Sequence, residues 1–505
     1  MSPAFVKHPL IKENVIEYRE YQNNILNTAL EKNTLCVLPT GLGKTPIAVM
    51  LTAHRLYTFP ESKALILAPT RPLAAQHYRT FIKFLNLPEE KFQIITGTTK
   101  PEKREMLYKE KTVFFATPQT IKNDIQDGRL SLKNFSLLVI DETHHAIGGY
   151  AYPYIVERYL QEAENQRILG LTASPGGDVE KIAEICKNAG VESIEIRTEH
   201  DEDVIPYVME KKIEWIYVEL PESFRKVRNM IQCALDEKIA VLRRLGITLR
   251  KNPSRKDLLT LQSRLRRESE KRANIALICV AEALKLEHAI TLLETQGVNI
   301  LESYWKKLRS SHSKIDKRLV SNRMVSNAMW LTQSMVETGA KHPKISKLCS
   351  VIYNELKEKP DSKIIIFANY RNTVKEIVKA LSGVSNARPV EFVGQKEGMT
   401  QKEQIKRIKE FSEGKYNILV ATSVAEEGMD IEKADTAIFY EPVPSGIRFI
   451  QRRGRVGRHS LGKIIVLITK KTRDEVYYWS AVAKEREMKK TLYGMKYTLS
   501  ENFWK

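Results

Sequence analysis

The sequence predicts an α/β protein in which two parallel-sheet lobes are separated by a helical insertion. Short apolar runs alternate with helix-compatible segments in the first 200 residues and again after residue 340, as in doubly wound sheets. Between these regions Pro and Gly are scarce, and Leu, Lys, Arg and Glu dominate. A chain of 505 residues is also too long for one core. We therefore expect three domains, residues 1–203, 204–337 and 338–505.

The first lobe contains a loop suited to binding phosphate. An apolar run at residues 35–38 leads into the loop formed by Pro39, Thr40, Gly41, Leu42, Gly43, Lys44 and Thr45, and helix-forming residues follow. Glycines let backbone N–H groups converge on an anion, and a helix N-terminus adds positive charge. Lys44 can reach the β- and γ-phosphates, and Thr45 can bind Mg²⁺. Leu38 replaces the first Gly of the general P-loop pattern, so an ordinary strand-to-helix turn remains an alternative.

Further apolar runs of the first lobe are expected strands. They lie at residues 64–68, 93–95, 112–116, 136–140 and 167–171. Polar residues follow these runs directly, namely Arg71, Thr117, Asp141, Glu142, Thr172 and Ser174. Ligands of parallel sheets lie outside the carboxyl ends of the strands, so we expect these residues on one rim. There, Asp141 can complete a Mg²⁺ shell and Glu142 can act as a base that orients water.

The expected helical insertion is strongly basic. Leu258, Leu261 and Leu265 recur at helical spacing. Residues 225–285 contain sixteen Lys or Arg against six Asp or Glu, and the basic pairs include Arg266, Arg267, Lys271 and Arg272. Any single basic pair is explained by a solvent-exposed helix face. Several pairs in a protein of net charge +20 favour contact with nucleic-acid phosphates.

The second lobe has strand candidates at residues 363–367, 390–393, 417–421, 436–440 and 463–468, but no phosphate loop. Its polar clusters include Thr422, Asp430, Gln451, Arg455 and Arg458. Arginine forms bidentate contacts with phosphate, and an arginine delivered from another domain can raise the rate of phosphoryl transfer by about 10³ to 10⁵. The two lobes together therefore predict an ATPase that is completed by interdomain contact.

Composition excludes other classes of protein. The five cysteines are dispersed without Cys-x-x-Cys spacing, which argues for reduced, buried thiols and against disulfides or a zinc site. No run of eighteen apolar residues occurs, and the N-terminus does not resemble a secretion signal. We therefore expect a cytoplasmic protein, associated with the nucleoid if it is archaeal.

These segments together resemble the motifs of the superfamily 2 helicases, which have two RecA-like lobes. Residues 39–45 are similar to motif I, in which the first Gly is normally missing, and residues 141–144 are similar to a DExH-type motif II. Residues 172–174, 422–430 and 451–458 are similar to motifs III, V and VI. Residues 421–428 and the basic insertion resemble the group of RIG-I-like receptors, the Dicer helicase module, archaeal Hef and its Fanconi-anaemia group M relatives. The Hef helicase region is the best match.

The resemblance implies ATP and Mg²⁺ as cofactors and a role for each motif. Arg19 and Gln22 would read adenine, residues 39–45 would hold phosphate, and Thr45 and Asp141 would bind Mg²⁺. Glu142 would activate water. Gln451, Arg455 and Arg458 would face the γ-phosphate, with Asp430 near the ribose. Arg71, Thr117 and Thr422 would contact the backbone of one nucleic-acid strand, whereas Thr172 and Ser174 would couple the lobes.

The expected activity is ATP-driven translocation that remodels branched or forked DNA. The helicase motifs contact phosphates, and such contacts do not distinguish ribose from deoxyribose. A double-stranded RNA translocase or an RNA helicase therefore remains an alternative. A nucleic-acid clamp with an inactive ATPase is disfavoured because the residues that the chemistry requires are present. Hef-type proteins also carry a C-terminal nuclease module, and nothing up to Lys505 resembles one. Either this sequence is part of a longer protein, or the resemblance to Hef does not hold in every detail.

Overall fold

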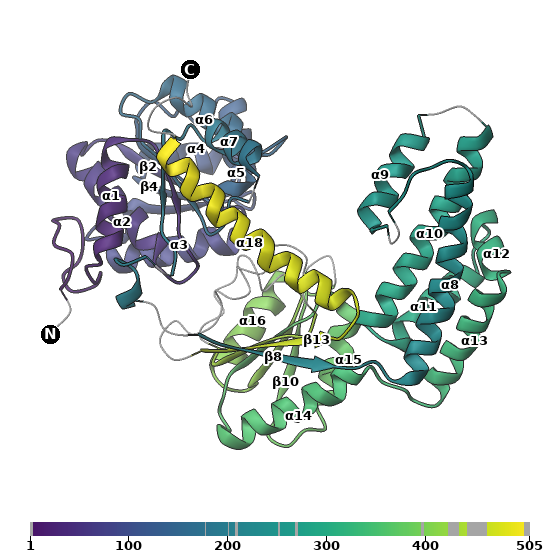
Figure 1. Cartoon of the computed structure of the whole chain (residues 1–505). Coiled ribbons are helices and arrows are strands. Elements are labelled where there is room, and N and C mark those ends of the chain that lie inside the picture. Colours follow the sequence, from purple (N-terminus) through teal and green to yellow (C-terminus); the bar gives the residue numbers. More distant parts are fainter. Residues whose placement is uncertain are drawn as a thin grey trace.

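The structure is a computed structural model that describes residues 4–176, 178–199, 201–207, 211–250, 253–267, 271–394, 398–422, 434–441 and 462–498. Two parallel sheets, a helical bundle and one long C-terminal helix make up the described part (Figure 1). Within it, none of the helices combines the length and hydrophobicity needed to cross a bilayer. All five cysteines carry free thiols, but Cys233 is exposed, whereas burial was expected.

The first sheet has seven parallel strands in the order β3-β4-β2-β5-β6-β1-β7. The strands are β1 (Thr34–Val37), β2 (Lys63–Leu67), β3 (Phe92–Ile95), β4 (Val113–Ala116), β5 (Phe135–Asp141), β6 (Ile168–Thr172) and β7 (Ser193–Ile196). Side chains alternate between two cores: Leu35 and Val37 enter one, and Cys36 and Leu38 enter the other. Both faces of the sheet are therefore buried, as the continuous apolar runs predict.

Helices cover both faces of this sheet. They are α1 (Glu20–Glu31), α2 (Lys44–Thr58), α3 (Arg71–Phe84), α4 (Pro101–Glu110), α5 (Pro118–Gln126), α6 (Ala151–Glu162) and α7 (Val179–Asn188), with short 3₁₀ turns η1 (Glu89–Lys91), η2 (Thr143–His145) and η3 (Ile205–Tyr207). Three of the helices, α2, α3 and α5, begin directly after a strand and its polar cluster. This arrangement puts helix N-termini at the carboxyl rim of the sheet.

The second sheet has six parallel strands in the order β10-β11-β9-β12-β13-β8. They are β8 (Lys211–Val218), β9 (Ile364–Phe367), β10 (Pro389–Phe392), β11 (Ile418–Ala421), β12 (Thr436–Phe439) and β13 (Gly462–Thr469). The accompanying helices are α14 (Pro343–Glu358), α15 (Arg371–Leu381) and α16 (Gln401–Ser412). The five strands expected after residue 340 are confirmed, and with the first sheet they give the predicted fold class of two parallel lobes and a helical insertion.

The strand β8 lies in a segment that was expected to be helical. We expected residues 204–337 to be helical, but β8 pairs in parallel with β13 over its whole length and forms an edge of the second sheet. Ile213 and Ile216 pack against the core of this sheet, whereas Trp215 and Tyr217 are exposed, as suits an edge strand with one covered face. The first bundle helix starts only at Glu222. The domain boundaries as a whole remain a prediction.

The helical bundle lies to one side of the lobes in Figure 1. It contains α8 (Glu222–Arg244), α9 (Arg255–Leu265), α10 (Lys271–Thr295), α11 (Val298–Arg309), α12 (Lys314–Val320) and α13 (Arg323–Glu337). Trp305 and the three leucines at positions 258, 261 and 265 are buried in its core. The bundle has its own hydrophobic core, separate from those of the two sheets.

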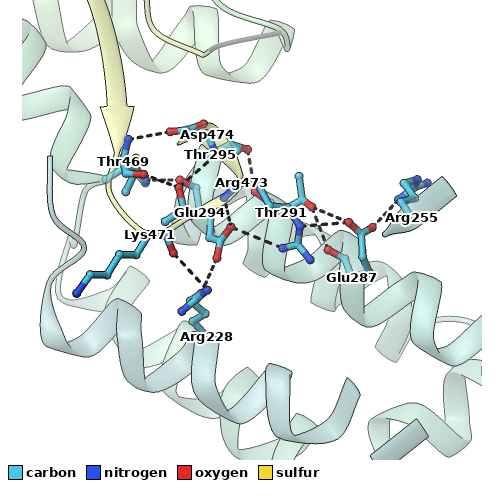
Figure 2. Close-up of polar contacts among 12 residues, drawn as sticks. Arg228, Arg255, Glu287, Thr291, Glu294, Thr295, Thr469, Lys471, Arg473 and Asp474 are labelled. Carbon is cyan, nitrogen blue, oxygen red and sulfur yellow. Dashed lines mark hydrogen bonds and ion pairs between the residues drawn. The ribbon is translucent and has the colours of Figure 1, made fainter. Parts of the chain in front are cut away.

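A buried polar network joins the bundle to the second lobe (Figure 2). Glu287 and Glu294 on α10 are only 3% and 1% exposed. Arg473 Nε lies 3.3 Å from Glu287 Oε1, and the Arg473 backbone N–H donates to Glu294 Oε2 at 3.0 Å. From α8, Arg228 Nε donates to Glu294 Oε1 at 2.5 Å, and Arg255 of α9 pairs with Glu287 at 3.2 Å. Arginines from three elements therefore neutralise both carboxylates.

The long helix α18 (Arg473–Thr498) contacts all three parts of the molecule (Figure 1). Beside Arg473, Asp474 pairs with the buried Lys344 of α14, which also donates to the Tyr440 carbonyl at 2.8 Å. Further along the helix, Tyr493 OH donates to Asp201 in the first lobe at 2.7 Å. The helix therefore begins at the junction of bundle and second lobe and ends on the first lobe.

His342 lies at the same junction. Its Nε2 donates to the Glu294 carbonyl at 3.0 Å, and its Nδ1 accepts from the Lys344 backbone N–H at 3.3 Å, which caps α14. Gly297 has φ 94°, and a Cβ there would lie 3.1 Å from the His342 Cβ. Complete burial and the nearby Lys344 ammonium lower the pKa of His342 to about 3. The imidazole is therefore neutral in the folded protein.

We predict that this junction makes stability depend on pH. The pKa of His342 falls from 6.5 when unfolded to about 3 when folded, so the unfolded chain binds the proton first. The stability is full above pH 6.5 and decreases below it, by about 1 kcal/mol between pH 6.5 and 5.5. His342→Asn keeps a capping acceptor without a titrating group. Between pH 6.5 and 5.5, the thermal midpoint of this variant should therefore fall less than that of the wild type. Equal losses in the two proteins would contradict the assignment.

Candidate nucleotide-binding and catalytic site

The phosphate loop connects β1 to α2 through two glycines with positive φ. Gly41 has φ 94° and Gly43 has φ 83°, in the left-handed region that only glycine adopts easily. Gly43 immediately precedes α2, so the helix N-terminus points its free N–H groups at the loop. Lys44 Nζ donates to the Leu38 carbonyl at 2.9 Å. The ammonium therefore lies within the loop, where a phosphate would take the place of this carbonyl as its partner.

Two residues of α1 contact the loop backbone. Gln22 Nε2 donates to the carbonyls of Leu42 and Gly43 at 3.1 and 3.3 Å. Tyr21 OH donates to the Leu42 carbonyl at 2.6 Å. A Cβ on Gly43 would lie 2.3 Å from Gln22 Nε2, so this position has no room for a side chain. The structure thus brings Gln22 to the loop, together with Tyr21, for which the sequence indicated no role.

A cavity of about 380 Å³ lies beside these residues, within the size range of small-molecule sites, about 300–1,000 Å³. Its lining includes Arg19 and Gln22, with apolar walls formed in part by Leu26, Leu30 and Met50. Other polar residues, among them Lys7, His8, Asn23 and His54, also line it, so the cavity combines apolar walls with several hydrogen-bonding groups, as a site for a heterocycle such as adenine requires.

Arg19 is held in place by three neighbours. Its Nη2 pairs with Glu17 at 3.0 Å, and its Nη1 donates to Tyr21 OH at 3.3 Å. Its guanidinium lies 5.2 Å from the ring centroid of Tyr207, in η3. Tyr207 was not predicted, since nothing in its local pattern indicates a contact with α1.

Asp141 and Glu142 lie at the carboxyl end of β5. Asp141 is the last strand residue, and its Oδ1 accepts the Glu142 backbone N–H at 3.0 Å. His77 Nε2 of α3 lies 2.8 Å from Asp141 Oδ2. Burial acts to raise the pKa of Asp141, but His77 and then Lys44 outweigh it, so the pKa lies below its usual range. Glu142 has φ 50°, uncommon for a residue other than glycine, which marks a constrained backbone at this site.

A chain of polar contacts runs from Glu142 to Ser174. His144 Nδ1 lies 3.2 Å from Glu142 Oε2, within ion-pair distance but without hydrogen-bond alignment, and 3.2 Å from Thr172 Oγ1. The Ser174 backbone N–H donates to Thr172 Oγ1 at 3.1 Å, and Ser174 Oγ donates to Met488 Sδ of α18 at 2.7 Å. The two residues expected to couple the lobes therefore connect the expected base to α18. His144 and Met488 were not predicted.

The residues present fit Mg²⁺ bound together with a nucleotide. Thr45 and Asp141 offer the hard oxygen donors that Mg²⁺ prefers. Among the residues that the structure describes, no group of three or more His, Cys, Asp or Glu side chains could hold a metal. Mg²⁺ usually keeps several waters and binds through one or two protein oxygens and substrate phosphates. Such an ion would neutralise charge on the phosphates.

Two expected nucleic-acid contacts lie on the same rim. Arg71 is exposed at the start of α3, and a Cβ on Gly97 would lie 3.6 Å from its Nη2. Thr117 precedes α5, with its Oγ1 2.9 Å from Thr120 Oγ1. In the second sheet, Thr422 follows β11 and is fully buried. Arg71 and Thr117 therefore reach the surface at the rim of the first lobe. Thr422, in the second lobe, does not reach the surface.

The other predicted residues lie elsewhere. In the bundle, Arg266, Arg267 and Arg272 are exposed, and Lys271 is the first residue of α10. A Cβ on Gly246 would lie 2.4 Å from Arg272 Nη2, so this arginine extends over the end of α8. Asp430, Gln451, Arg455 and Arg458 lie outside the described residues, and their roles remain predictions.

Comparison with known proteins identifies the family. The model of the DEAD/DEAH box helicase family matches residues 19–182, and that of the helicase conserved C-terminal domain matches residues 343–460. A family described as "Putative ATP-dependent RNA helicase, helical bundle" matches residues 223–338. The crystal structure of the Pyrococcus furiosus Hef helicase domain is 43% identical, covers 93% of this chain and 99% of that chain, and superimposes with a TM-score of 0.73. The chain belongs to the superfamily 2 helicases of the Hef type.

Curated relatives of this helicase chain are longer than it is. The putative ATP-dependent RNA helicase MJ1505 of Methanocaldococcus jannaschii is 44% identical over 98% of this chain and 63% of its own length. The ATP-dependent DNA helicase mph1 of Neurospora crassa is 33% identical over 90% of this chain and 41% of its own length. The DEAD-box ATP-dependent RNA helicase FANCM of Arabidopsis thaliana is 35% identical over 90% of this chain and 35% of its own length. The chain thus carries the domains of an ATP-dependent helicase and spans part of each relative.

We predict different defects for two substitutions in the site. Lys44→Ala should abolish hydrolysis and weaken nucleotide binding, because it removes the cation held within the loop. Glu142→Gln should also stop turnover but spare nucleotide binding, since Asp141 and Lys44 remain. Phosphate release measures turnover, and a fluorescent ATP analogue measures binding. Normal turnover by Glu142→Gln would show that another residue is the base.

Proposed function

We propose that this chain is an ATP-dependent DNA translocase that remodels branched or forked DNA and hydrolyses ATP with Mg²⁺ at the interface of its two lobes. The observation that carries this proposal is the shared rim of the first sheet. Lys44, Asp141 and Glu142 lie there, and so does the exposed Arg71. Nucleotide and nucleic acid would therefore bind to neighbouring strand ends of one rigid sheet.

Each residue of the nucleotide site has a distinct task in this proposal. Lys44 and the loop N–H groups bind the phosphates, and Thr45 and Asp141 bind Mg²⁺. Glu142 orients the attacking water. Arg455 and Arg458, with Gln451, approach from the second lobe when the lobes close, and they act on the transition state more than on ATP binding.

The contact with nucleic acid is proposed to be electrostatic and directed at the backbone. Arg71 and Thr117 offer a guanidinium and a hydroxyl next to the N-termini of α3 and α5, where phosphates bind well. Arg266, Arg267 and Arg272 would hold a duplex arm from the bundle. None of these groups reads base edges, so the translocase would act independently of sequence.

DNA is favoured over RNA by the relatives, although their names differ. The proteins from Neurospora crassa and Schizosaccharomyces pombe are named as DNA helicases, whereas the relative from Methanocaldococcus jannaschii is named as a putative RNA helicase and that from Arabidopsis thaliana as an RNA helicase. Contacts with phosphate alone do not distinguish the two polymers. The double-stranded RNA translocase is therefore kept as the second candidate.

We predict that forked DNA stimulates ATP hydrolysis more than linear duplex DNA, single-stranded DNA or double-stranded RNA does. Phosphate release by the purified chain at one fixed salt concentration, with each polymer at the same nucleotide concentration, measures this order. Stimulation by double-stranded RNA above that by every DNA would favour the second candidate. Hydrolysis that no polymer stimulates would contradict the proposal altogether.

We also predict a role for the basic end of the bundle. Changing Arg266, Arg267, Lys271 and Arg272 together to Glu should weaken DNA binding and flatten its salt dependence. The slope of log K against log salt should change by about one for each phosphate that the variant no longer neutralises. Preference for forks should fall, and ATP binding should persist. Binding titrations at several salt concentrations measure the slope.

The matched control reverses the same number of charges on the second lobe. The exposed residues Lys375, Lys379, Lys402 and Lys406 lie on α15 and α16. Their change to Glu alters net charge equally and should affect binding much less. Equal effects of the two variants would mean that only net charge matters, and that the basic pairs of the bundle form a solvated face.

A further inference from the structure

We propose that His77 is a positioning residue for Asp141, and that α3 couples the orientation of this carboxylate to nucleic-acid contact at Arg71. The inference rests on the function proposed above, in which Asp141 binds Mg²⁺ and Arg71 contacts a phosphate. His77 would touch neither nucleotide nor metal.

The carboxylate of Asp141 is held at both of its oxygens. Oδ1 accepts the Glu142 backbone N–H at 3.0 Å, and Oδ2 lies 2.8 Å from His77 Nε2. The side chains of His77 and Asp141 are only 6% and 9% exposed, so water does not compete freely for this contact. Rotation of the carboxylate would break both interactions. The backbone contact comes from the same strand end, but the imidazole comes from a different element.

The second imidazole nitrogen indicates which way the hydrogen bond runs. His77 Nδ1 is buried and has no hydrogen-bond partner among the described residues. A buried N–H without an acceptor is costly, so the proton belongs on Nε2. His77 therefore donates to Asp141 and leaves the negative charge on the carboxylate.

The packing of α3 fixes where this donor lies. Ala74, His77 and Phe81 form the buried face of the helix. The Phe81 ring meets the His77 ring edge to face at 6.4 Å and the Phe115 ring at 5.0 Å. His77 is thus held between the core and Asp141, and it moves only if α3 moves.

The same helix begins at the rim with Arg71. Arg71 is the first residue of α3, and its six-residue separation from His77 corresponds to about 9 Å along the helix axis. A helix of this length moves as a rigid rod. A phosphate that pulls Arg71 would therefore shift His77 Nε2 relative to Asp141. Conversely, a change at Asp141 would shift Arg71.

This geometry matters because Mg²⁺ demands a near-ideal octahedral shell. Hydrogen bonds to the free oxygen of a ligating carboxylate orient it, and their loss typically weakens metal binding about 10- to 100-fold. The simpler alternative is that His77 only fills space beneath α3. The two interpretations differ in whether an N–H at this position is needed.

Three variants separate these interpretations. His77→Leu fills a similar space without a donor, and His77→Gln places an amide N–H near the position of Nε2. Phe84→Leu is the matched control, because Phe84 packs against the core from the same helix, about two turns beyond His77. Thermal unfolding in EDTA checks that each variant is folded.

The measured quantity is the Mg²⁺ dependence of binding of a fluorescent, non-hydrolysable ATP analogue, so no turnover is involved. We expect His77→Leu to require about 10- to 100-fold more Mg²⁺ than the wild type. His77→Gln and Phe84→Leu should stay close to the wild type, and binding in EDTA should be equal for all. Wild-type Mg²⁺ dependence in His77→Leu, or failure of Gln to restore it, would overturn the positioning role.

A second arm adds saturating duplex DNA. DNA should lower the Mg²⁺ requirement of the wild type by a factor of about 5 or more, but not that of Arg71→Ala or His77→Leu. An unchanged requirement in the wild type would overturn the coupling through α3. If binding of the analogue does not depend on Mg²⁺ even in the wild type, Asp141 does not have its proposed function. The positioning role of His77 then fails as well.

Discussion

Burial of both faces of each parallel sheet is the constraint on which the rest of the structure depends. In β1, Leu35 and Val37 enter one core while Cys36 and Leu38 enter the other, so neither face is left for a charged group. The charged side chains of the central strands therefore lie at or beyond the strand ends, as Asp141 and Lys44 do. Parallel strands bring those ends to one edge, which is why Lys44, Asp141 and Thr172 meet although they are far apart in sequence. The same edge receives the N-termini of α2, α3 and α5, and its electrostatic character follows from the backbone as much as from side chains.

The junction of bundle and second lobe depends on a different kind of interaction. Glu287 and Glu294 are almost fully buried, and burial of a carboxylate is expensive unless a cation and hydrogen bonds compensate. Arg228, Arg255 and Arg473 supply them from three helices. Such a network is weak evidence for stability, because apolar residues could fill the same space. Arg228 and Arg255 belong to the bundle itself, however, whereas Arg473 begins α18, so the pairs of Arg473 with Glu287 and Glu294 hold the bundle against the second lobe.

The sequence was sufficient for the sheets but not for the contacts between elements. Continuous apolar runs predicted the described strands other than β7 and β8, since buried parallel strands are apolar on both faces. The edge strand β7 was missed because it alternates polar and apolar residues, as at Glu195, and β8 was missed because it begins with two lysines inside a region expected to be helical. Gln22 was predicted through the family resemblance and does contact the phosphate loop. Tyr207, His77 and Met488 were not predicted, because each acts through a partner distant in sequence and leaves no periodic pattern.

The path of α18 also determines how the lobes can separate. The chain connects them once through the segment before β8, and α18 connects them again by the contacts of Met488 and Tyr493 with the first lobe. Two tethers keep the lobes at a high effective concentration, on the order of millimolar or above. A lobe–lobe attraction too weak to be measured between free domains is then enough to bring them together. Nucleotide and nucleic acid need to supply only a small difference in free energy between open and closed forms, and each can be released without the lobes drifting apart.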